Sequence, residues 1–165
     1  MARKQASRTG QRVLETDFNF NFNDWVIDSA DGAKKTFGSS VGLSADPAEI
    51  GLTGLVANTI TFDGINMPPG AVIAGGSLIV ETAGVGPTAY TVSLGVAGNL
   101  ASILAATSLL VAGRTALPLT APLVSNNGQN IRATVAYTVA NATAGRFRLR
   151  VHYTLDGRAE ETIGG

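Results

Sequence analysis

The residues with the clearest potential for chemistry lie near the end of the chain, where polar and apolar side chains alternate. Arg146, Arg148, Arg150 and His152 occupy every second position there. Residues two apart on a β-strand point to the same face, so these four side chains would form one row, called the basic row below. His152 is the only histidine of the chain, which excludes a histidine-rich metal site and a two-histidine zinc motif. A Ser-His-Asp triad is opposed by the arginines, because they disfavour the imidazolium that this chemistry needs.

The basic row needs partners, because like charges about 7 Å apart on one strand face repel each other. One possibility is a solvated sheet face on which cross-strand acids such as Glu81 neutralise the arginines. The other is an interface, where the planar guanidinium makes bidentate contacts. We predict that Arg146, Arg148, Arg150 and His152 form a subunit or partner interface. Nucleic acid is not expected as the partner, because basic and acidic residues are equal in number.

No other motif indicates catalysis or cofactor binding. The chain has no cysteine, which excludes disulfides, thiolate nucleophiles and cysteine-ligated zinc. It also contains no P-loop and no dinucleotide-binding glycine motif. Asp31, Asp63 and Asp156 each precede a glycine, so we expect them to shape turns rather than to bind calcium. We therefore predict that the chain is not an enzyme and has no cofactor or metal site; a hydrolase with paired carboxylates is the enzymatic alternative.

Alternating segments predict the strands that would position these side chains. Phe18, Phe20 and Phe22 alternate with asparagines, which is typical of a half-buried strand, although a sugar-stacking platform is an alternative for these aromatic residues. The apolar phase shifts before Trp25, which indicates a bulge or bend, and the Asp-Gly pair at 31–32 favours a hairpin after it. Further strands are predicted for residues 55–62, 71–73, 77–82, 88–96, 131–139 and 146–155.

Turns and two short helices are predicted between these strands. Residues 63–64 and 67–70 have turn sequences, and the glycine pair at 75–76 indicates a bulge. Residues 46–49 could form a single helical turn with an aspartate cap and a proline at its first position. Residues 99–112 are rich in Ala and Leu and contain no Pro or Gly, which permits a short helix.

About eight or nine strands, joined by Gly, Pro and Asn turns and not alternating with long helices, predict an all-β fold. We expect residues 17–165 to form a single antiparallel β-sandwich, jelly-roll-like in topology, and residues 1–16 to form a flexible, extended N-terminal arm. The first twelve residues contain no acid and almost no apolar residue, so they cannot bury enough surface to become ordered before they meet a partner. The basic residues of the arm are Arg3, Lys4, Arg8 and Arg12.

The composition favours assembly. Of 165 residues, 45% are hydrophobic and only 15% are charged, and the formal net charge is zero. An ordinary globular domain has about 25% charged residues, and net charge is what normally opposes association. No apolar stretch approaches the roughly 18 residues of a membrane span, and the N-terminus lacks the apolar region of a secretory signal. We therefore expect synthesis in the cytoplasm, self-association and no membrane partner.

The stretch from Asn58 to Arg158 resembles the head decoration, or cement, proteins of tailed bacteriophages. The resemblance is carried by TFDGINMPPGAVIAGGSLIVET at residues 61–82, LAATSLLVAGRTAL at residues 104–117 and NATAGRFRLRVHYTLDGRAE at residues 141–160. These segments are strands and turns rather than catalytic signatures. The resemblance therefore points to a structural protein of the virion.

The resemblance implies a β-sandwich that oligomerises, commonly as a homotrimer, and binds the outside of a capsid. Such a protein clamps adjacent subunits of the major capsid protein, often with an N-terminal arm, and is made in the cytoplasm of the bacterial host. Here the capsid-contacting arm would carry Arg3, Lys4, Arg8 and Arg12. A tail or fibre-associated module that binds a receptor or carbohydrate is the alternative, and it would expose aromatic side chains at its loop tips.

Overall fold

The computed structural model describes residues 13–29, 32, 34–37, 59–118, 123–125, 128–138 and 141–155. These residues form eleven β-strands, more than the eight or nine expected, and no helix. Within them there is therefore no helix of the length and apolarity that a membrane crossing requires. The strands are β1 (Leu14–Asn21), β2 (Trp25–Ile27), β3 (Lys34–Thr36), β4 (Thr59–Asn66), β5 (Ala71–Val85), β6 (Ala89–Val96), β7 (Asn99–Ser108), β8 (Gly113–Ala116), β9 (Leu123–Ser125), β10 (Asn130–Thr138) and β11 (Ala144–Leu155).

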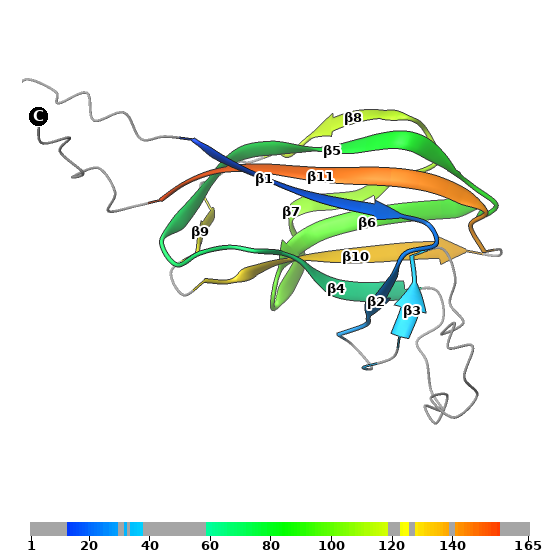
Figure 1. Ribbon diagram of the computed structural model, residues 1–165, viewed down its shortest axis with the longest axis horizontal. Helices are drawn as coiled ribbons and strands as arrows, with labels where there is room; N and C mark the ends of the chain where they lie inside the picture. The colour runs from blue at the N-terminus through cyan, green and yellow to red at the C-terminus, as the bar shows by residue number, and fades with distance from the viewer. Residues whose placement is uncertain are drawn as a thin grey trace, which may run out of the picture.

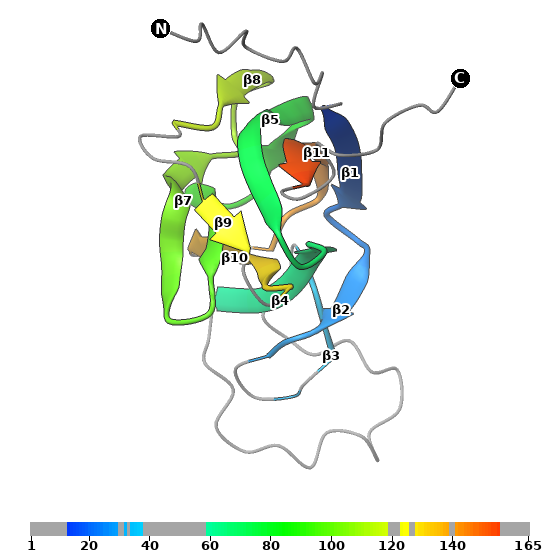
Figure 2. The ribbon, with the colours of Figure 1, turned by 90° about the vertical axis from the view of Figure 1, so that its left-hand side faces the viewer.

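Two antiparallel sheets form a sandwich (Figure 1). The first sheet has the order β1-β11-β5-β8, with the short β9 also paired to β5, and the second has the order β4-β10-β6-β7. Figure 2 shows the two layers from one end, with β1 and β7 on opposite sides of the molecule. The prediction of an antiparallel β-sandwich is confirmed.

The strand order is that of a jelly roll. When the short strands β2, β3 and β9 are left aside, the chain pairs from its two ends inward. Strand β1 pairs with β11, β4 with β10, β5 with β8, and β6 with β7 in the central hairpin. This pattern is a long hairpin rolled up so that its successive pairs alternate between the two sheets. The rolled topology makes β11 a central strand of the first sheet, and it therefore places the basic row between β1 and β5.

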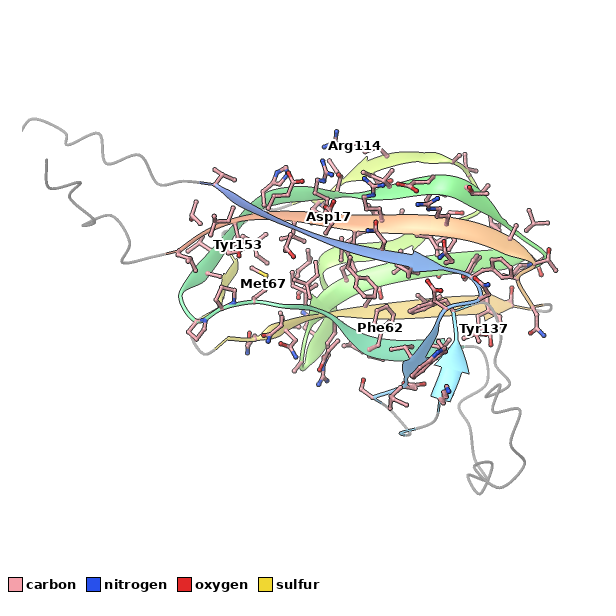
Figure 3. All side chains as sticks on the ribbon, viewed as in Figure 1. Asp17, Phe62, Met67, Arg114, Tyr137 and Tyr153 are labelled. Carbon is pink, nitrogen blue, oxygen red and sulfur yellow. The ribbon has the colours of Figure 1, made fainter. Side chains whose placement is uncertain are left out.

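The core lies between the sheets and is rich in aromatic side chains. Phe20, Phe37, Phe62 and Phe147 are all almost completely buried. The ring centroid of Phe20 lies 4.8 Å from that of Phe37 and 5.0 Å from that of Phe147, in the tilted arrangements that aromatic pairs prefer. Figure 3 shows Phe62 between the two layers. The phenylalanines of β1 are therefore part of the core and not a platform for sugar stacking.

Strand β5 is longer than its partner β11 and compensates with three register shifts. One shift lies opposite the step from His152 to Tyr153, where the glycine pair at 75–76 predicts a bulge, and it confirms that prediction. At Gly76 a Cβ atom would lie 2.3 Å from the Arg150 carbonyl oxygen, so only glycine fits this close approach. A second shift leaves Glu81 as the extra residue on β5, because Arg146 pairs with Thr82 while the next residue of β11 pairs with Val80.

The helix predicted for residues 99–112 is wrong. Residues 99–108 form the edge strand β7, which pairs with β6. Ile103 and Leu104 are buried in the core, whereas Ala105 and Ala106 face outward. Helix propensity favours Ala and Leu by only a few tenths of a kcal/mol per residue, so pairing with β6 and burial of two large apolar side chains override it.

Two further expectations about boundaries are also corrected. The strand expected to end at residues 63–64 continues to Asn66, because Gly64 is an extra residue in a bulge opposite β10 and not part of a turn. Strand β1 begins at Leu14, so residues 14–16, expected in the arm, pair with β11. The predicted turn at residues 67–70 is confirmed, with the Ala71 amide donating to the Pro68 carbonyl at 3.1 Å. The helical turn predicted at residues 46–49 lies outside the described residues.

A small hairpin of β2 and β3 covers the β4 edge of the second sheet. The bend predicted before Trp25 is confirmed, because β1 ends at Asn21 and a turn separates it from β2. Lys35 and Asp28 form an ion pair of 2.5 Å in which both side chains are fully buried. The other oxygen of Asp28 accepts a hydrogen bond from the Thr61 amide on β4 at 3.1 Å, and the Thr61 carbonyl accepts one from the Ser29 amide at 2.7 Å. These contacts hold the hairpin against the sandwich.

Candidate functional site

The basic row lies on the outer face of the first sheet. On β11 the apolar residues Phe147, Leu149 and Val151 are buried in the core, so the alternate residues point outward. The register places Glu15 opposite His152 and Asp17 opposite Arg150. Figure 3 shows Asp17 on this outer layer. The predicted strand and the common direction of its four polar side chains are confirmed.

Carboxylates of β1 and β5 neutralise the basic row. Arg150 makes a bidentate contact with Asp17, in which Nε donates to Oδ1 at 2.9 Å and Nη2 donates to Oδ2 at 3.0 Å. Glu81 lies between two arginines, 2.9 Å from Arg146 Nε and 2.5 Å from Arg148 Nη2. The bulge in β5 makes this double contact possible, because the extra residue there re-aims its side chain. The cross-strand acids considered in the sequence analysis are therefore present, including Glu81.

His152 forms a cross-strand pair. Its Nε2 lies 3.1 Å from Glu15 Oε2, and the other oxygen of Glu15 lies 3.1 Å from Arg150 Nε. Glu15 belongs to the segment expected to be an arm, so it was not predicted as a partner of the row. The seven side chains form what we call the charged strip: Arg146, Arg148, Arg150, His152, Glu15, Asp17 and Glu81.

The bidentate contact between Arg150 and Asp17 shifts the pKa of both groups. The hydrogen bonds from Arg150 hold the pKa of Asp17 below its ordinary value, with the charge of the same guanidinium adding to the effect and partial desolvation opposing it. The contact in turn raises the pKa of Arg150. Because the pair is exposed to solvent, its contribution to stability is small. The strip is thus a surface whose charges are mutually satisfied.

A further arginine, Arg114, lies beside the charged strip. Arg114 on β8 lies in the same row as Arg148, with Ile79 of β5 between them. Its side chain is exposed and projects away from the sandwich (Figure 3). Among the described residues Arg114 makes no ion pair, so its exposed guanidinium can still donate to an external carboxylate. Arg148, by contrast, is held by Glu81 through Nη2, and its Nε is buried without a hydrogen-bond partner.

The described residues contain no cluster of reactive groups. No three His, Asp or Glu side chains in this part of the chain lie close enough together to hold a metal ion. Asp63, expected to shape a turn, instead pairs with Arg132 on β10 at 2.8 Å. Asp31 and Asp156 lie outside the described residues, as do Arg3, Lys4, Arg8 and Arg12 of the predicted arm.

Exposed apolar side chains form a second feature, which was not predicted from the sequence. Trp25 is 61% exposed on the outer side of the hairpin, where the Lys34 ammonium lies 3.9 Å from its ring centroid. Val85 and Val111 are 56% and 72% exposed. Val85 and Val111 lie in a stretch without any charged residue, from position 82 to position 113. The absence of charge in this stretch is the sequence feature from which an exposed apolar surface could have been predicted.

Comparison with known proteins bears on the fold. No family model and no curated protein matches the chain. A chain in a solved structure described as the Cyanophage Pam1 capsid asymmetric unit is similar, with a TM-score of 0.56 and 18% sequence identity over 94% of this chain and 92% of that one. The two chains share a fold. The similarity extends over nearly the whole length of both, so it is the complete jelly roll and not a fragment of it that they have in common.

Proposed function

We propose that this chain is a structural protein of a phage virion that binds the outside of the capsid and stabilises the shell by bridging capsid subunits. The observation that carries the proposal is the fold shared with a chain of a phage capsid assembly over 94% of this chain. The resemblance of residues 61–82, 104–117 and 141–160 to decoration proteins supports the same role. In this proposal the partners are the major capsid protein and further copies of the chain, assembled as a homotrimer.

The charge distribution is consistent with a clamp. Residues 1–12 carry basic side chains and no acid, so an arm of this composition can become ordered on an acidic partner. Strand β1 begins at Leu14 beside the end of β11, so the arm leaves the sandwich at the edge of the sheet that carries the charged strip. Arm and strip can then contact the same capsid neighbourhood. Many copies of such a contact stabilise a shell without any single tight one.

Deletion of residues 1–12 tests the arm. Because β1 begins at Leu14, the shortened chain should keep its sandwich and its melting temperature. We expect its occupancy on purified shells, measured by quantitative gel densitometry and cryo-electron microscopy, to fall at least about tenfold, because several charge-assisted contacts are lost. If the shortened chain occupied purified shells as fully as the wild type does, the arm would not be a capsid contact.

A charge swap tests whether a partner uses the charged strip. Arg150→Asp alone breaks the contact with Asp17, whereas Arg150→Asp combined with Asp17→Arg restores a pair of opposite charges within the strip. If the side chains of the charged strip contact only one another and no partner, the swapped chain should attach to shells as the wild type does. We expect attachment to remain weak in the swapped chain, since the partner would meet a carboxylate where it requires a guanidinium.

A further inference from the structure

Charged side chains are unevenly distributed over the sandwich. The outer face of the first sheet carries the charged strip, and the Asp63–Arg132 pair lies on β4 and β10 of the second sheet, whereas residues 82–113 contain no Asp, Glu, Lys, Arg or His. This stretch comprises the end of β5, all of β6 and β7 and the loop before β8. Figure 2 shows β7 along the side of the molecule away from β1. We call the outward-facing part of residues 82–113 the neutral surface.

The neutral surface combines small side chains with a projecting apolar tip. On β7, Ala101, Ala105 and Ala106 are exposed, and such small residues allow a neighbouring molecule to approach closely. Val85 and Val111 are the exposed valines of this surface. Val85 follows Gly84, and Val111 lies two residues after Leu109; the Gly84 amide donates a hydrogen bond of 2.8 Å to the Leu109 carbonyl. The two valines therefore lie at the same end of the sandwich. Together with the small side chains of β7, they give this surface an apolar end that a partner could cover.

The edge of the neutral surface is not suited to accept another strand. Edge strands are usually protected from strand addition by charged residues or by bulges. Strand β7 has no charged residue, but its register against β6 shifts twice, once between Val92 and Leu94 and once between Leu94 and Val96. These irregularities interrupt the regular row of backbone groups that a partner strand would need. A partner must therefore pack against side chains rather than extend the sheet.

Charge decides which partner fits. In a symmetric assembly, equivalent or neighbouring patches of identical molecules face each other. A surface with a net charge of one sign would repel its own copy there, and ion pairs such as those of the charged strip would have to be desolvated. The neutral surface has neither cost, and its Ser and Thr hydroxyls both donate and accept hydrogen bonds, so it can meet a copy of itself without a mismatch. Interface cores are depleted of charged residues in the same way.

We propose that the neutral surface is where copies of this chain contact one another. It specifies the self-association that the proposed function includes, and it leaves the charged strip and the arm free for the shell. Ala105 and Val111 lie within the contact in this arrangement. A charge introduced at either position would be buried against the neighbouring copy without a partner.

Ala105→Glu and Val111→Asp test the proposal, with Asn66→Glu as the matched control. Asn66 is exposed at the end of β4, which lies at the opposite edge of the second sheet from β7, so the control adds the same charge away from the neutral surface. The mass of each full-length protein is measured by sedimentation over a dilution series. We expect wild type and control to form the same oligomer, and each of the two variants to raise its dissociation constant about 100-fold, since a desolvated, unpaired charge costs several kcal/mol at an interface. The melting temperatures of the variants are compared with that of the wild type at a dilution at which the wild type is monomeric, and equal values show that the variants are folded.

Three results would overturn the proposal: a monomeric wild-type chain, oligomers of the two variants as stable as those of the wild type, and equal weakening by Asn66→Glu. Attachment to shells is measured on the same samples to separate this proposal from the proposed function. Wild-type oligomers that do not attach to any shell leave the contact between copies in place and refute the capsid role. Monomers that attach to shells, and lose attachment through Val111→Asp, assign the neutral surface to the capsid protein instead.

Discussion

The buried ion pair of Lys35 and Asp28 makes the stability of the hairpin testable. Both side chains have no solvent exposure, and their charged atoms are 2.5 Å apart. Lys35→Met keeps most of the length and the apolar stem of the side chain but leaves the Asp28 carboxylate buried without its ammonium. Removing one partner of a buried pair costs about 3–5 kcal/mol of unfolding free energy. For a chain of this size, about 2–4 °C of melting temperature are lost per kcal/mol, so we expect the variant to melt roughly 10 °C below the wild type.

Asp28→Asn and the double variant complete a thermodynamic cycle. Asparagine can still accept the hydrogen bond from the Thr61 amide through its side-chain oxygen, so this change removes mainly the charge. We expect each single variant to be strongly destabilised. The double variant, in which no charge remains buried, should be at least about 2 kcal/mol more stable than the sum of the two single changes predicts.

Urea unfolding followed by far-ultraviolet circular dichroism measures these free energies at one protein concentration, because self-association shifts apparent stability. Trp25 is the only tryptophan of the chain and lies on the same hairpin, so its fluorescence shows whether the hairpin opens before the sandwich does. A Lys35→Met chain within about 1 kcal/mol of the wild type, or strictly additive effects in the cycle, would show that Lys35 and Asp28 do not stabilise the fold as a pair.

Two further predictions follow from close contacts. At Gly95 a Cβ atom would lie 2.1 Å from the Asn99 carbonyl oxygen. Gly95→Ala should therefore force β7 away from β6 and lower the free energy of unfolding, measured in urea, by at least about 1–3 kcal/mol. Gly75→Ala is the control, because the nearest atom to a Cβ there is 3.9 Å away, and it should lower this free energy by less. Equal losses at both sites would contradict this. Because Arg150 lowers the pKa of Asp17, the pair stabilises the fold above the ordinary carboxylate pKa, and this contribution is lost as the pH falls through the lowered pKa of the folded state. Carbon NMR titration should therefore give a lower midpoint for Asp17 in the wild type than in Arg150→Gln, and an unchanged midpoint would exclude the contact in solution.

The sequence predicted strands well where one face of the strand is buried. In β10, and in β11 from Phe147 to Val151, every second residue is apolar and buried, because a strand with one face on the core exposes its other face to solvent. The antiparallel sandwich and its jelly-roll character followed from the number of such strands and their turns. The failure at residues 99–112 has the opposite cause: β7 is an edge strand with small outward side chains, so its pattern is not clearly alternating and its composition is that of a helix.

The candidate site was predicted in part. The outward direction of Arg146, Arg148 and Arg150 followed from their spacing alone, and Glu81 was identified as a possible cross-strand partner. Glu15 was not, because the pairing of β1 with β11 joins residues from opposite ends of the chain, and a pairing of that kind is encoded in the whole fold and not in a local pattern. The bulge that allows Glu81 to reach two arginines depends on register and was equally inaccessible.

The position of the chain ends has a practical consequence. Leu14, where β1 begins, lies opposite Tyr153, and Leu155, where β11 ends, lies opposite Ala71 at the start of β5; both ends of the described chain therefore leave the sandwich on one side (Figure 1). A foreign segment joined before Leu14 or after Leu155 would therefore start from the end of the sandwich opposite to the β5–β6 turn and the exposed Val85. Labels placed there leave the contact proposed between copies undisturbed, whereas an insertion in the β5–β6 turn would interrupt it.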